Sequence, residues 1–374
     1  MKRILFINDY VVGGGVEKVL SDLVLNLPKE NYDITVGFMI PNAPFSTIYN
    51  EDIKCIKIAS IFDKLIDSNN IIAKVVNKIY NLISIKKCKS YVDNNFDIVV
   101  AFKEGDCMEW ISTLQKPRKL GWIHVDYRVN HWTKGLFYNN IDLEIECMNR
   151  FEYIVCVSEG VRQGVVDVLG EFNNLRICYN PLDITNILRQ SKEEVTDIKK
   201  NQDKLLLLSV GRLAHQKGYA RLLHICSRLN EEFKNYELWI IGEGEEFRQL
   251  EQLKLQLNLE NIKLLGNKTN PYKYMKMADW MVCSSYYEGF STVLQEAAVL
   301  EVPILTTDCA GSKELLGSNN EYGIVVQNSD EALEVGLRKI LNERALLSYY
   351  GRRIAERKGF VDLNNRINRI VEYL

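Results

Sequence analysis

The sequence has little of what marks a metal-binding or redox protein. Its nine cysteines form no C-x-x-C pair, and its four histidines, His124, His131, His215 and His224, have no ligand spacing. Cysteines scattered through apolar runs are typical of small core residues in a reducing compartment, and isolated histidines argue against a structural metal. We therefore expect no metal ion and no cofactor.

Long apolar runs and a strong net charge are also missing. No run approaches the roughly twenty apolar residues that span a bilayer, and the apolar residues after Met1 are followed by no small-residue cleavage site. The first residues therefore predict a strand and not a signal peptide, and we expect a cytoplasmic protein. A formal net charge of −2 offers no general attraction to nucleic acid.

Strand-like and helical segments alternate along all 374 residues, a length beyond what one hydrophobic core usually serves. This alternation predicts an α/β protein of two doubly wound domains, each a parallel sheet with helices on both faces. The expected strands span residues 4–8, 34–39, 98–102, 119–124 and 153–157 in the first half, and 204–211, 237–241, 262–265, 280–284, 303–306 and 323–326 in the second.

The pattern breaks around Asp183, where a polar and charged stretch begins. We predict a first domain over residues 1–183 and a second over 184–355, with a C-terminal helix over about 356–374 that packs back on the first. Ligands of doubly wound sheets bind outside the carboxyl ends of the strands. Two facing domains therefore predict a site in the cleft between them.

The segment from Glu288 to Glu296 follows an expected strand and begins an expected helix. Ser291 or Thr292 can cap that helix, and Thr292 with Gln295 has the spacing of a capping box. Backbone N–H groups and the positive helix end then point to one place, which suits a diphosphate. Carboxylates beside it are suited to accept hydrogen bonds from sugar and ribose hydroxyls. Taken alone, the two glutamates are equally consistent with a solvated helix face.

Two cations follow the first strand of the second half. Arg212 offers a planar fork and Lys217 a point charge, a pair suited to a diphosphate. The alternative is an exposed loop of solvated cations.

In the first half, the run Gly13-Gly14-Gly15 lets a backbone approach a ligand closely. Lys18 takes the place of the third glycine of the dinucleotide fingerprint, so a nicotinamide dehydrogenase is not expected.

Together these landmarks resemble the retaining glycosyltransferases of family 4, which have the GT-B fold of two Rossmann-like domains facing each other across a cleft. The resemblance covers nearly the whole chain. In that family the second domain binds the nucleotide sugar and the first mostly binds the acceptor. The matching positions, in family order, are Gly13-Gly14-Gly15, His124, Ser158-Glu159, Tyr179-Asn180-Pro181, Gly211-Arg212 with Lys217-Gly218, Gly242-Glu243-Gly244, and Glu288 through Glu296.

The resemblance implies catalytic roles for four residues. Arg212 and Lys217 would hold the donor diphosphate, Glu288 would face the sugar hydroxyls, and His124 would touch the donor sugar near the reacting carbon. A lone histidine is, however, more often a structural hydrogen-bonding residue. Glu296 would accept both ribose hydroxyls. The other implied donor-binding positions are Gly14, Gly15, Gly242, the base-gripping Asn267 and Lys268, and the cradle of Gly289, Phe290, Ser291 and Thr292.

A glycosyl diphosphate has a good leaving group once its charge is neutralised, so cations and a helix start can supply most of the catalysis without metal. The resemblance implies retention of configuration, with the departing phosphate oxygen helping to remove the acceptor proton. We expect a hexosyltransferase that uses a nucleotide-diphosphate sugar, UDP-linked rather than GDP-linked. Its acceptor would be a glycan or lipid-linked glycan of capsular or other surface polysaccharide. The alternatives are a sugar-nucleotide epimerase of the same fold and a non-catalytic partner subunit.

One basic stretch suggests where an acceptor would come from. Residues 64–89 carry six lysines, the first Lys64 and the last Lys89, against one aspartate, with apolar residues at helical spacing. Such a helix can lie on an anionic membrane surface, or it can pack on the core with solvated lysines. The first alternative would place the protein at the inner face of the cell membrane.

Overall fold

The computed structural model describes residues 1–10, 14–40, 53–58, 85–137 and 139–374. They form two compact units: Met1–Val157, Arg162–Tyr179 and Ile367–Leu374 make the first, and Ser158–Val161 and Asn180–Arg366 the second. The main segment of the second unit begins at Asn180, close to the predicted boundary at Asp183. The predicted C-terminal helix over 356–374 is replaced by a short 3-10 turn and a separate helix, whose last residues belong to the first unit.

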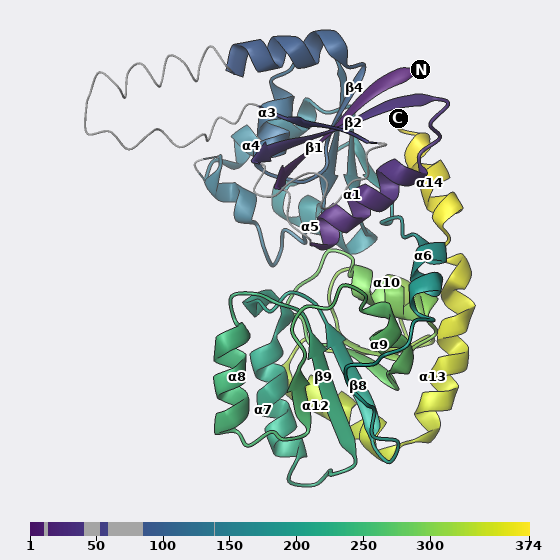
Figure 1. Cartoon of the computed structure of the whole chain (residues 1–374). Helices are drawn as coiled ribbons and strands as arrows, with labels where there is room; N and C mark the ends of the chain where they lie inside the picture. Colours follow the sequence, from purple (N-terminus) through teal and green to yellow (C-terminus); the bar gives the residue numbers. More distant parts are fainter. Residues whose placement is uncertain (11–13, 41–52, 59–84, 138) are drawn as a thin grey trace, which may run out of the picture. The chain divides into compact units, whose positions relative to one another are not determined.

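The first unit is built on a parallel sheet in the order β3-β2-β1-β4-β5-β6-β7 (Figure 1). In β1, Ile4, Leu5, Phe6 and Ile7 are all fully buried, as expected for a strand covered on both faces. The sequence predicted β1, β2, β4, β5 and β6 but missed β3 and β7. The strands are β1 (Lys2–Tyr10), β2 (Tyr32–Ile40), β3 (Lys54–Lys57), β4 (Ile98–Ala101), β5 (Arg118–Ile123), β6 (Tyr153–Cys156) and β7 (Leu175–Ile177).

Helices cover both faces of this sheet. From β1 the chain moves to β2 towards one edge of the sheet, and from β4 it moves to β5 towards the other edge. Because such connections are right-handed, the helices of these two crossovers lie on opposite faces of the sheet. The helices are α1 (Gly15–Asn26), α3 (Asp106–Ser112), the 3-10 helix η2 (Trp132–Gly135), α4 (Ile141–Asn149), α5 (Glu159–Leu169) and α14 (Leu363–Val371). The unit division falls inside α5 and α14.

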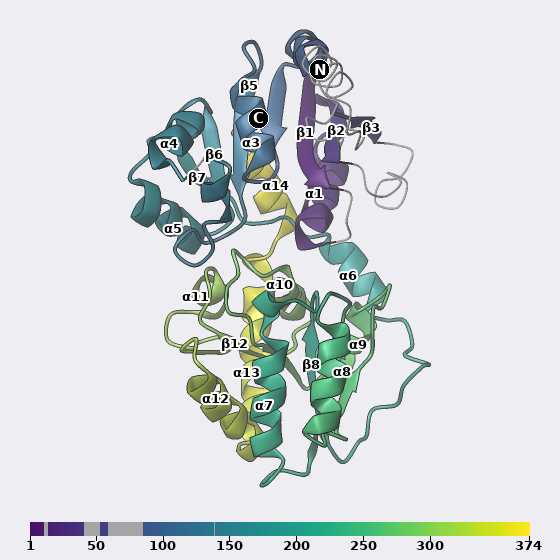
Figure 2. The ribbon, with the colours of Figure 1, turned by 90° about the vertical axis from the view of Figure 1, so that its left-hand side faces the viewer.

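The second unit has a parallel sheet in the order β10-β9-β8-β11-β12-β13. Helices α7, α8 and α12 lie on one face, and α9, α10 and α13 on the other (Figures 1 and 2). All its strands were predicted to within two residues. They are β8 (Leu205–Val210), β9 (Tyr236–Ile241), β10 (Ile262–Leu264), β11 (Trp280–Cys283), β12 (Ile304–Thr307) and β13 (Ile324–Val326).

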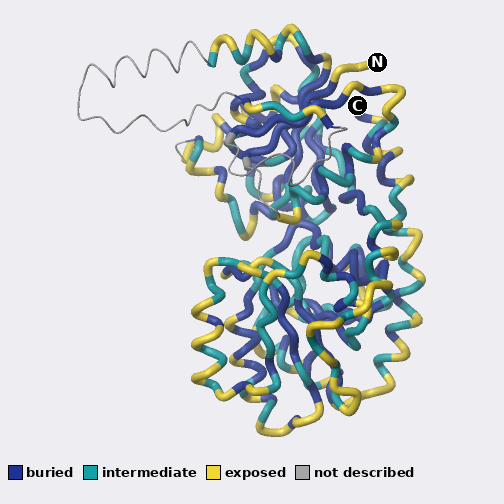
Figure 3. The backbone as a smooth tube through the Cα atoms, viewed as in Figure 1, coloured by how far each residue is buried: buried dark blue, intermediate teal, exposed yellow. Residues whose placement is uncertain are grey.

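Helices α7 and α12 bury an apolar stripe and leave their outer sides exposed, whereas α10 is buried from Leu294 to Val299 (Figure 3). The helices of the second unit are α6 (Ile184–Gln190), η3 (His215–Lys217), α7 (Tyr219–Leu229), α8 (Phe247–Gln256), α9 (Tyr272–Met277), α10 (Thr292–Val299), α11 (Ser312–Leu316), α12 (Asp330–Asn342), α13 (Ala345–Ala355) and η4 (Glu356–Gly359).

Each sheet reverses its strand order at its centre, between β1 and β4 in the first unit and between β8 and β11 in the second. Loops leaving neighbouring strands diverge there, which opens a ligand crevice at the carboxyl edge of the sheet. In the second unit, Arg212 and Lys217 follow β8, and Glu288 follows β11.

Within the described ranges, none of the helices combines the length and the apolar character that crossing a bilayer requires. Most of the basic stretch that begins with Lys64 lies outside the described residues, so its predicted membrane contact stays a prediction. The described end of that stretch, from residue 85 to Lys89, is helical.

Candidate functional site

Three loops are bonded together at the carboxyl edge of the second sheet. The backbone N–H of Gly211 donates to the carbonyl of Ile241 at 3.0 Å, and that of Gly242 donates to the carbonyl of Gly266 at 2.9 Å. Gly242 has a φ of 148°, and a Cβ there would lie 1.9 Å from the carbonyl oxygen of Gly211. Only glycine allows this approach, which fixes the loop that carries Arg212.

Lys217 and Glu288 form an ion pair at this edge. The Nζ of Lys217 lies 2.7 Å from Oε1 of Glu288, and the hydroxyl of Ser285 donates to the same oxygen at 2.6 Å. Both charged side chains are largely buried. Burial acts to lower the pKa of Lys217, but the attraction of the Glu288 carboxylate is stronger than the effect of burial. The pKa of Lys217 is therefore raised above its ordinary value. The lysine therefore stays protonated, and its ammonium has further N–H groups for an anion.

A left-handed glycine holds Lys217 in place. Gly218 has a φ of 65° at the start of α7, and a Cβ there would lie 2.2 Å from the carbonyl oxygen of Ser284. The Ser284 hydroxyl donates to the carbonyl of Lys217 at 2.9 Å. Two backbone constraints thus position the lysine. Arg212, on the same loop, is exposed, and within the described part of the chain its guanidinium has no hydrogen-bond or ion-pair partner.

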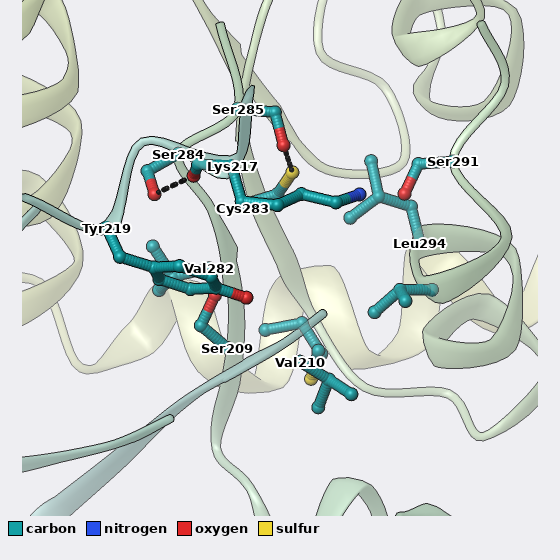
Figure 4. Close-up of a pocket in the computed structure, with 12 residues that line it drawn as sticks. Ser209, Val210, Lys217, Tyr219, Val282, Cys283, Ser284, Ser285, Ser291 and Leu294 are labelled. Carbon is teal, nitrogen blue, oxygen red and sulfur yellow. Dashed lines mark hydrogen bonds between the residues drawn. The ribbon is translucent and has the colours of Figure 1, made fainter. Parts of the chain in front are cut away.

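A small pocket lies beside Lys217, lined by residues from β8, β11 and the start of α10. Figure 4 shows the Lys217 side chain extending across this pocket towards Ser291. The end of the lysine and the first turn of α10 therefore border the same space.

The start of α10 differs from its prediction. Ser291 is the N-cap and makes no side-chain capping bond. The capping box of Thr292 and Gln295 is wrong, because the Gln295 amide instead donates to the Ser291 carbonyl at 3.2 Å and accepts from Arg366 at 2.6 Å. In the described residues, the first N–H groups of α10 thus have no side-chain cap, which leaves the helix start suited to an anion.

Two cradle residues are held by packing and bonding to the rest of the unit. Phe290 is buried and packs edge-on against Phe360, with ring centroids 6.3 Å apart. Its side chain therefore serves packing, and only its backbone can serve a ligand. The carbonyl of Gly289 accepts from the Ser158 hydroxyl at 2.8 Å. That hydroxyl also accepts from the N–H of Val161 at 3.1 Å, so Ser158 caps α5.

The predicted ribose and base residues lie on the same unit. Glu296 is buried in α10 and accepts from the Tyr272 hydroxyl at 3.3 Å. Asn267 is exposed in the loop after β10. Lys268 lies 2.7 Å from Asp197. Hydrogen bonds from Lys268 and from the Tyr274 hydroxyl lower the pKa of Asp197 to about 2.

Arg221 supports the Glu288 loop from behind, a role the sequence did not reveal. It is 4% exposed and donates to the backbone carbonyls of Ser284 and Ser285, each at 2.7 Å. The Thr307 hydroxyl donates to the Ser285 carbonyl as well, at 2.6 Å. An arginine in an amphipathic helix is ordinarily solvated, so no local pattern distinguishes this one.

His124 lies in the first unit, at the end of β5. Its Nε2–H donates to the carbonyl of Phe102 at 3.0 Å, which leaves Nδ1 as a hydrogen-bond acceptor. Burial lowers the pKa of His124 to about 4, and the charge of Lys103 acts in the same direction. The ring is therefore neutral near pH 7 and can orient a hydroxyl. His131 bonds to the buried Glu144 at 2.7 Å, a structural contact within the first unit.

The glycine loop after β1 is anchored by Glu17. Its carboxylate accepts from the N–H of Gly14 at 3.1 Å and from the Asn8 amide at 3.3 Å. Burial raises the pKa of Glu17. Gly14 and Gly15 are exposed at the start of α1, where a ligand can approach their backbone.

The structure thus gathers the predicted second-unit residues at one edge of one sheet, and His124 with Gly14 at the corresponding edge of the other. Within the described ranges, no three histidine, cysteine or acidic side chains group as metal ligands would.

Comparison with known proteins agrees with this geometry. The family model described as glycosyl transferases group 1 matches residues 190–357, nearly all of the second unit. The match spans 168 of the 374 residues of the chain, so the similarity to this family concerns the second unit. The matched residues include the Lys217–Glu288 pair, the α10 start and Arg212.

Relatives and solved structures extend the likeness. The N-acetylgalactosamine-N,N'-diacetylbacillosaminyl-diphospho-undecaprenol 4-alpha-N-acetylgalactosaminyltransferase of Campylobacter jejuni is 36% identical over 177 residues, 46% of each chain. The lipopolysaccharide 1,6-galactosyltransferase of Salmonella typhimurium is 24% identical over 335 residues, 85% of this chain and 84% of that protein. Several curated relatives, the Campylobacter protein among them, are matched over less than half of their own length, between 43% and 48%.

The crystal structure of Anabaena HepE in complex with UDP superposes with a TM-score of 0.78, at 18% identity, and covers 100% of this chain and 99% of HepE. This likeness concerns the fold. The chain has the GT-B fold, as the resemblance implied.

Proposed function

We propose that this chain is a hexosyltransferase that moves a sugar from a UDP-sugar to a saccharide acceptor, with retention of configuration. The observation that carries the proposal is the Lys217–Glu288 pair at the uncapped start of α10, with the exposed Arg212 on the same loop as the lysine. This arrangement offers cations and helix N–H groups to a diphosphate, and a carboxylate to sugar hydroxyls.

In the proposed reaction, the bond between the anomeric carbon and the β-phosphate oxygen breaks, and a bond forms between that carbon and an acceptor hydroxyl oxygen. The hydroxyl proton passes to the departing phosphate, so the products are UDP and a glycoside. Lys217, Arg212 and the α10 start stabilise the charge that develops on the diphosphate. Because these groups neutralise that charge, we expect full activity in the presence of EDTA.

Glu288, Glu296 and His124 divide the remaining work. The Glu288 carboxylate, with one oxygen on Lys217 and Ser285, keeps acceptor capacity for a sugar hydroxyl. Glu296 lies about one turn further along α10 and would accept from the ribose. The neutral His124 would orient the donor sugar through Nδ1.

The relatives support the choice of substrate. The Campylobacter and Salmonella proteins are named for transfer to diphospho-undecaprenol-linked and lipopolysaccharide saccharides, and HepE is seen with UDP and, in another crystal, with UDP-glucose. We propose that the acceptor is a saccharide of surface polysaccharide synthesis, carried on a lipid at the inner face of the cell membrane.

A panel of UDP-sugars tests the proposal, first by thermal stabilisation, since a specific donor raises apparent stability by mass action. The stabilising donors are then incubated with p-nitrophenyl glycosides of common hexoses and N-acetylhexosamines, with EDTA present, and UDP and new glycoside are measured. We expect equimolar UDP and glycoside from the wild type, and loss of both in Glu288→Gln.

A parallel incubation with donor alone separates the alternatives. Formation of a second UDP-sugar without any acceptor would identify an epimerase. Binding of donors without turnover by the isolated chain would point to a non-catalytic subunit. Arg248→Ala, an exposed arginine in α8 of the same unit, is the control for Arg212→Ala and should keep wild-type turnover.

A further inference from the structure

One tryptophan of this chain is exposed, and the structure describes all five. Four are at most 3% exposed, whereas Trp132 is 36% exposed: the buried ones are Trp110, Trp122, Trp239 and Trp280. We propose that Trp132 is the platform of a saccharide-binding subsite in the first unit, which takes a hexose of the acceptor. This inference rests on the proposed function and names the part of the chain that recognises the acceptor.

Two buried carboxylates and a glycine hold the Trp132 ring. Its indole N–H donates to Oε1 of Glu104 at 3.2 Å, and Glu104 is 1% exposed. Its neighbours in the chain, His131 and Thr133, both bond at 2.7 Å to the buried Glu144. An aromatic ring fixed in this way loses little conformational freedom when a ligand packs on it.

The backbone is adapted to the ring as well. Gly105 has a φ of 99°, and a Cβ built there would lie 2.3 Å from the Trp132 ring. A side chain at this position would both strain the backbone and displace the indole. The first unit therefore fixes, through Glu104, Glu144 and Gly105, an aromatic surface that it leaves partly open to solvent.

The position of this ring is where the fold predicts a ligand. Lys103 and Glu104 follow β4, and Asp9 is the penultimate residue of β1, so all three lie at the carboxyl ends of the strands between which the first sheet reverses its order. Glu104 also accepts from the backbone N–H of His124 at 2.9 Å. One carboxylate thus ties the Trp132 ring to the histidine that we assign to the donor sugar.

The surroundings of the ring have the polarity that a hexose needs. Lys103 Nζ lies 5.3 Å from the centroid of the Trp132 ring and 3.2 Å from a carboxylate oxygen of Asp9. A pyranose presents one apolar C–H face, which packs on aromatic rings, and a rim of hydroxyls that donate and accept. The indole face matches the apolar C–H face, and the Lys103 ammonium can donate to hydroxyl oxygens. Asp9 is 3% exposed and also accepts from the Cys107 thiol at 2.7 Å, so its carboxylate holds the ammonium in place.

Acceptor kinetics and a spectroscopic signal test the proposal on the full chain. With the p-nitrophenyl glycoside that the wild type uses, we expect Trp132→Ala to raise the acceptor KM about tenfold, the ratio that 1.4 kcal/mol represents. The donor KM should stay unchanged, and Trp132→Phe should restore part of the loss. Val129→Ala is the matched control, since Val129 is 58% exposed near Trp132 in the chain.

Labelling with 5-fluorotryptophan gives a binding readout that needs no turnover. The fluorine resonance missing in Trp132→Phe belongs to Trp132, and we expect the p-nitrophenyl glycosides, but not UDP, to shift it. If no glycoside shifts it, or if Trp132→Ala keeps the wild-type acceptor KM, the subsite is wrong even where transfer occurs. If the resonance shifts while no donor is turned over, the subsite stands and the proposed transfer fails.

Discussion

The chemistry of the second unit is concentrated in a few side chains whose charges are fixed by their neighbours. Lys217 is kept protonated by Glu288, and Glu288 keeps its position through Lys217 and Ser285. Removing either partner leaves the other charge buried without its counterpart, which costs both stability and function.

Lys217→Ala should lower kcat about 10²- to 10³-fold, because a positioned charge at the leaving group is lost. It should also lower the free energy of unfolding by about 1–3 kcal/mol, because Glu288 loses a buried partner. Turnover assays and urea denaturation measure the two effects. Lys199→Ala, an exposed lysine of the same unit, should change neither. Wild-type turnover in Lys217→Ala would remove this lysine from the site.

His124 makes a prediction about pH. Its pKa of about 4 lies below the ordinary value of about 6.5. Between these values the unfolded chain binds a proton that the folded chain does not, so His124 lowers stability as the pH falls from about 6.5 to 4. In His124→Gln, urea midpoints at pH 7 and pH 5 should lie closer together than in the wild type. His224→Gln, at an exposed histidine, should keep the wild-type difference, and an unchanged difference in His124→Gln contradicts the assignment.

The elements position these residues through backbone geometry at strand ends. The sequence alone predicted the strands of the second unit, because continuous apolar runs such as Trp280-Met281-Val282 are simple local signals. It also placed Lys217 and Glu288 at one edge. It did not predict that Gln295 turns away from the helix start, because its partner Arg366 lies 71 positions away. Arg221 and Trp132 were missed for the same reason, since the carbonyls and the carboxylate that fix their side chains are distant in the sequence.

Two glycines with the same φ allow the cost of backbone strain to be measured apart from the cost of a steric clash. Gly218 and Gly266 both have a φ of 65°, but a Cβ at Gly218 would meet the Ser284 carbonyl at 2.2 Å, whereas a Cβ at Gly266 meets nothing within 4 Å. Both alanine variants should lose about 1–3 kcal/mol of unfolding free energy from strain. Gly218→Ala should lose more unfolding free energy than Gly266→Ala, as measured by urea denaturation. Its turnover should also fall, because the clash displaces Lys217. Equal losses would mean that the Ser284 contact is not restrictive.

At the scale of the whole molecule, the chain forms two compact units, and its last residues belong to the first of them. Residues 367–374 belong to the first unit, where Ile370 and Leu374 are buried. Lys2 and Arg118 donate to the carbonyl of Leu374 at 2.9 and 2.8 Å. The prediction that the C-terminal segment packs on the first domain agrees with this division. Its amphipathic pattern alone would not have specified which of the two sheets the helix packs on.

Deleting residues 367–374 should destabilise the first unit selectively, since each buried apolar side chain contributes about 1.5–3 kcal/mol. Hydrogen exchange can be measured in increasing urea on peptides from each unit. In the truncated chain, β1 and β5 should exchange at lower urea than in the wild type, whereas the urea dependence of exchange in β8 and β11 should not change. Arg369→Ala, on the exposed side of α14, should leave both units as in the wild type. Equal shifts in both units would contradict the separate cores.

The central claim is that the Lys217–Glu288 site of the second unit transfers a hexose from a UDP-sugar with retention. A proton NMR time course of the full chain with a stabilising UDP-sugar and its accepted p-nitrophenyl glycoside tests this directly. We predict a new anomeric signal with the configuration of the donor, growing in step with UDP in the wild type and absent in Glu288→Gln. An inverted anomer would contradict retention, and an equal rate in Glu288→Gln would contradict the site.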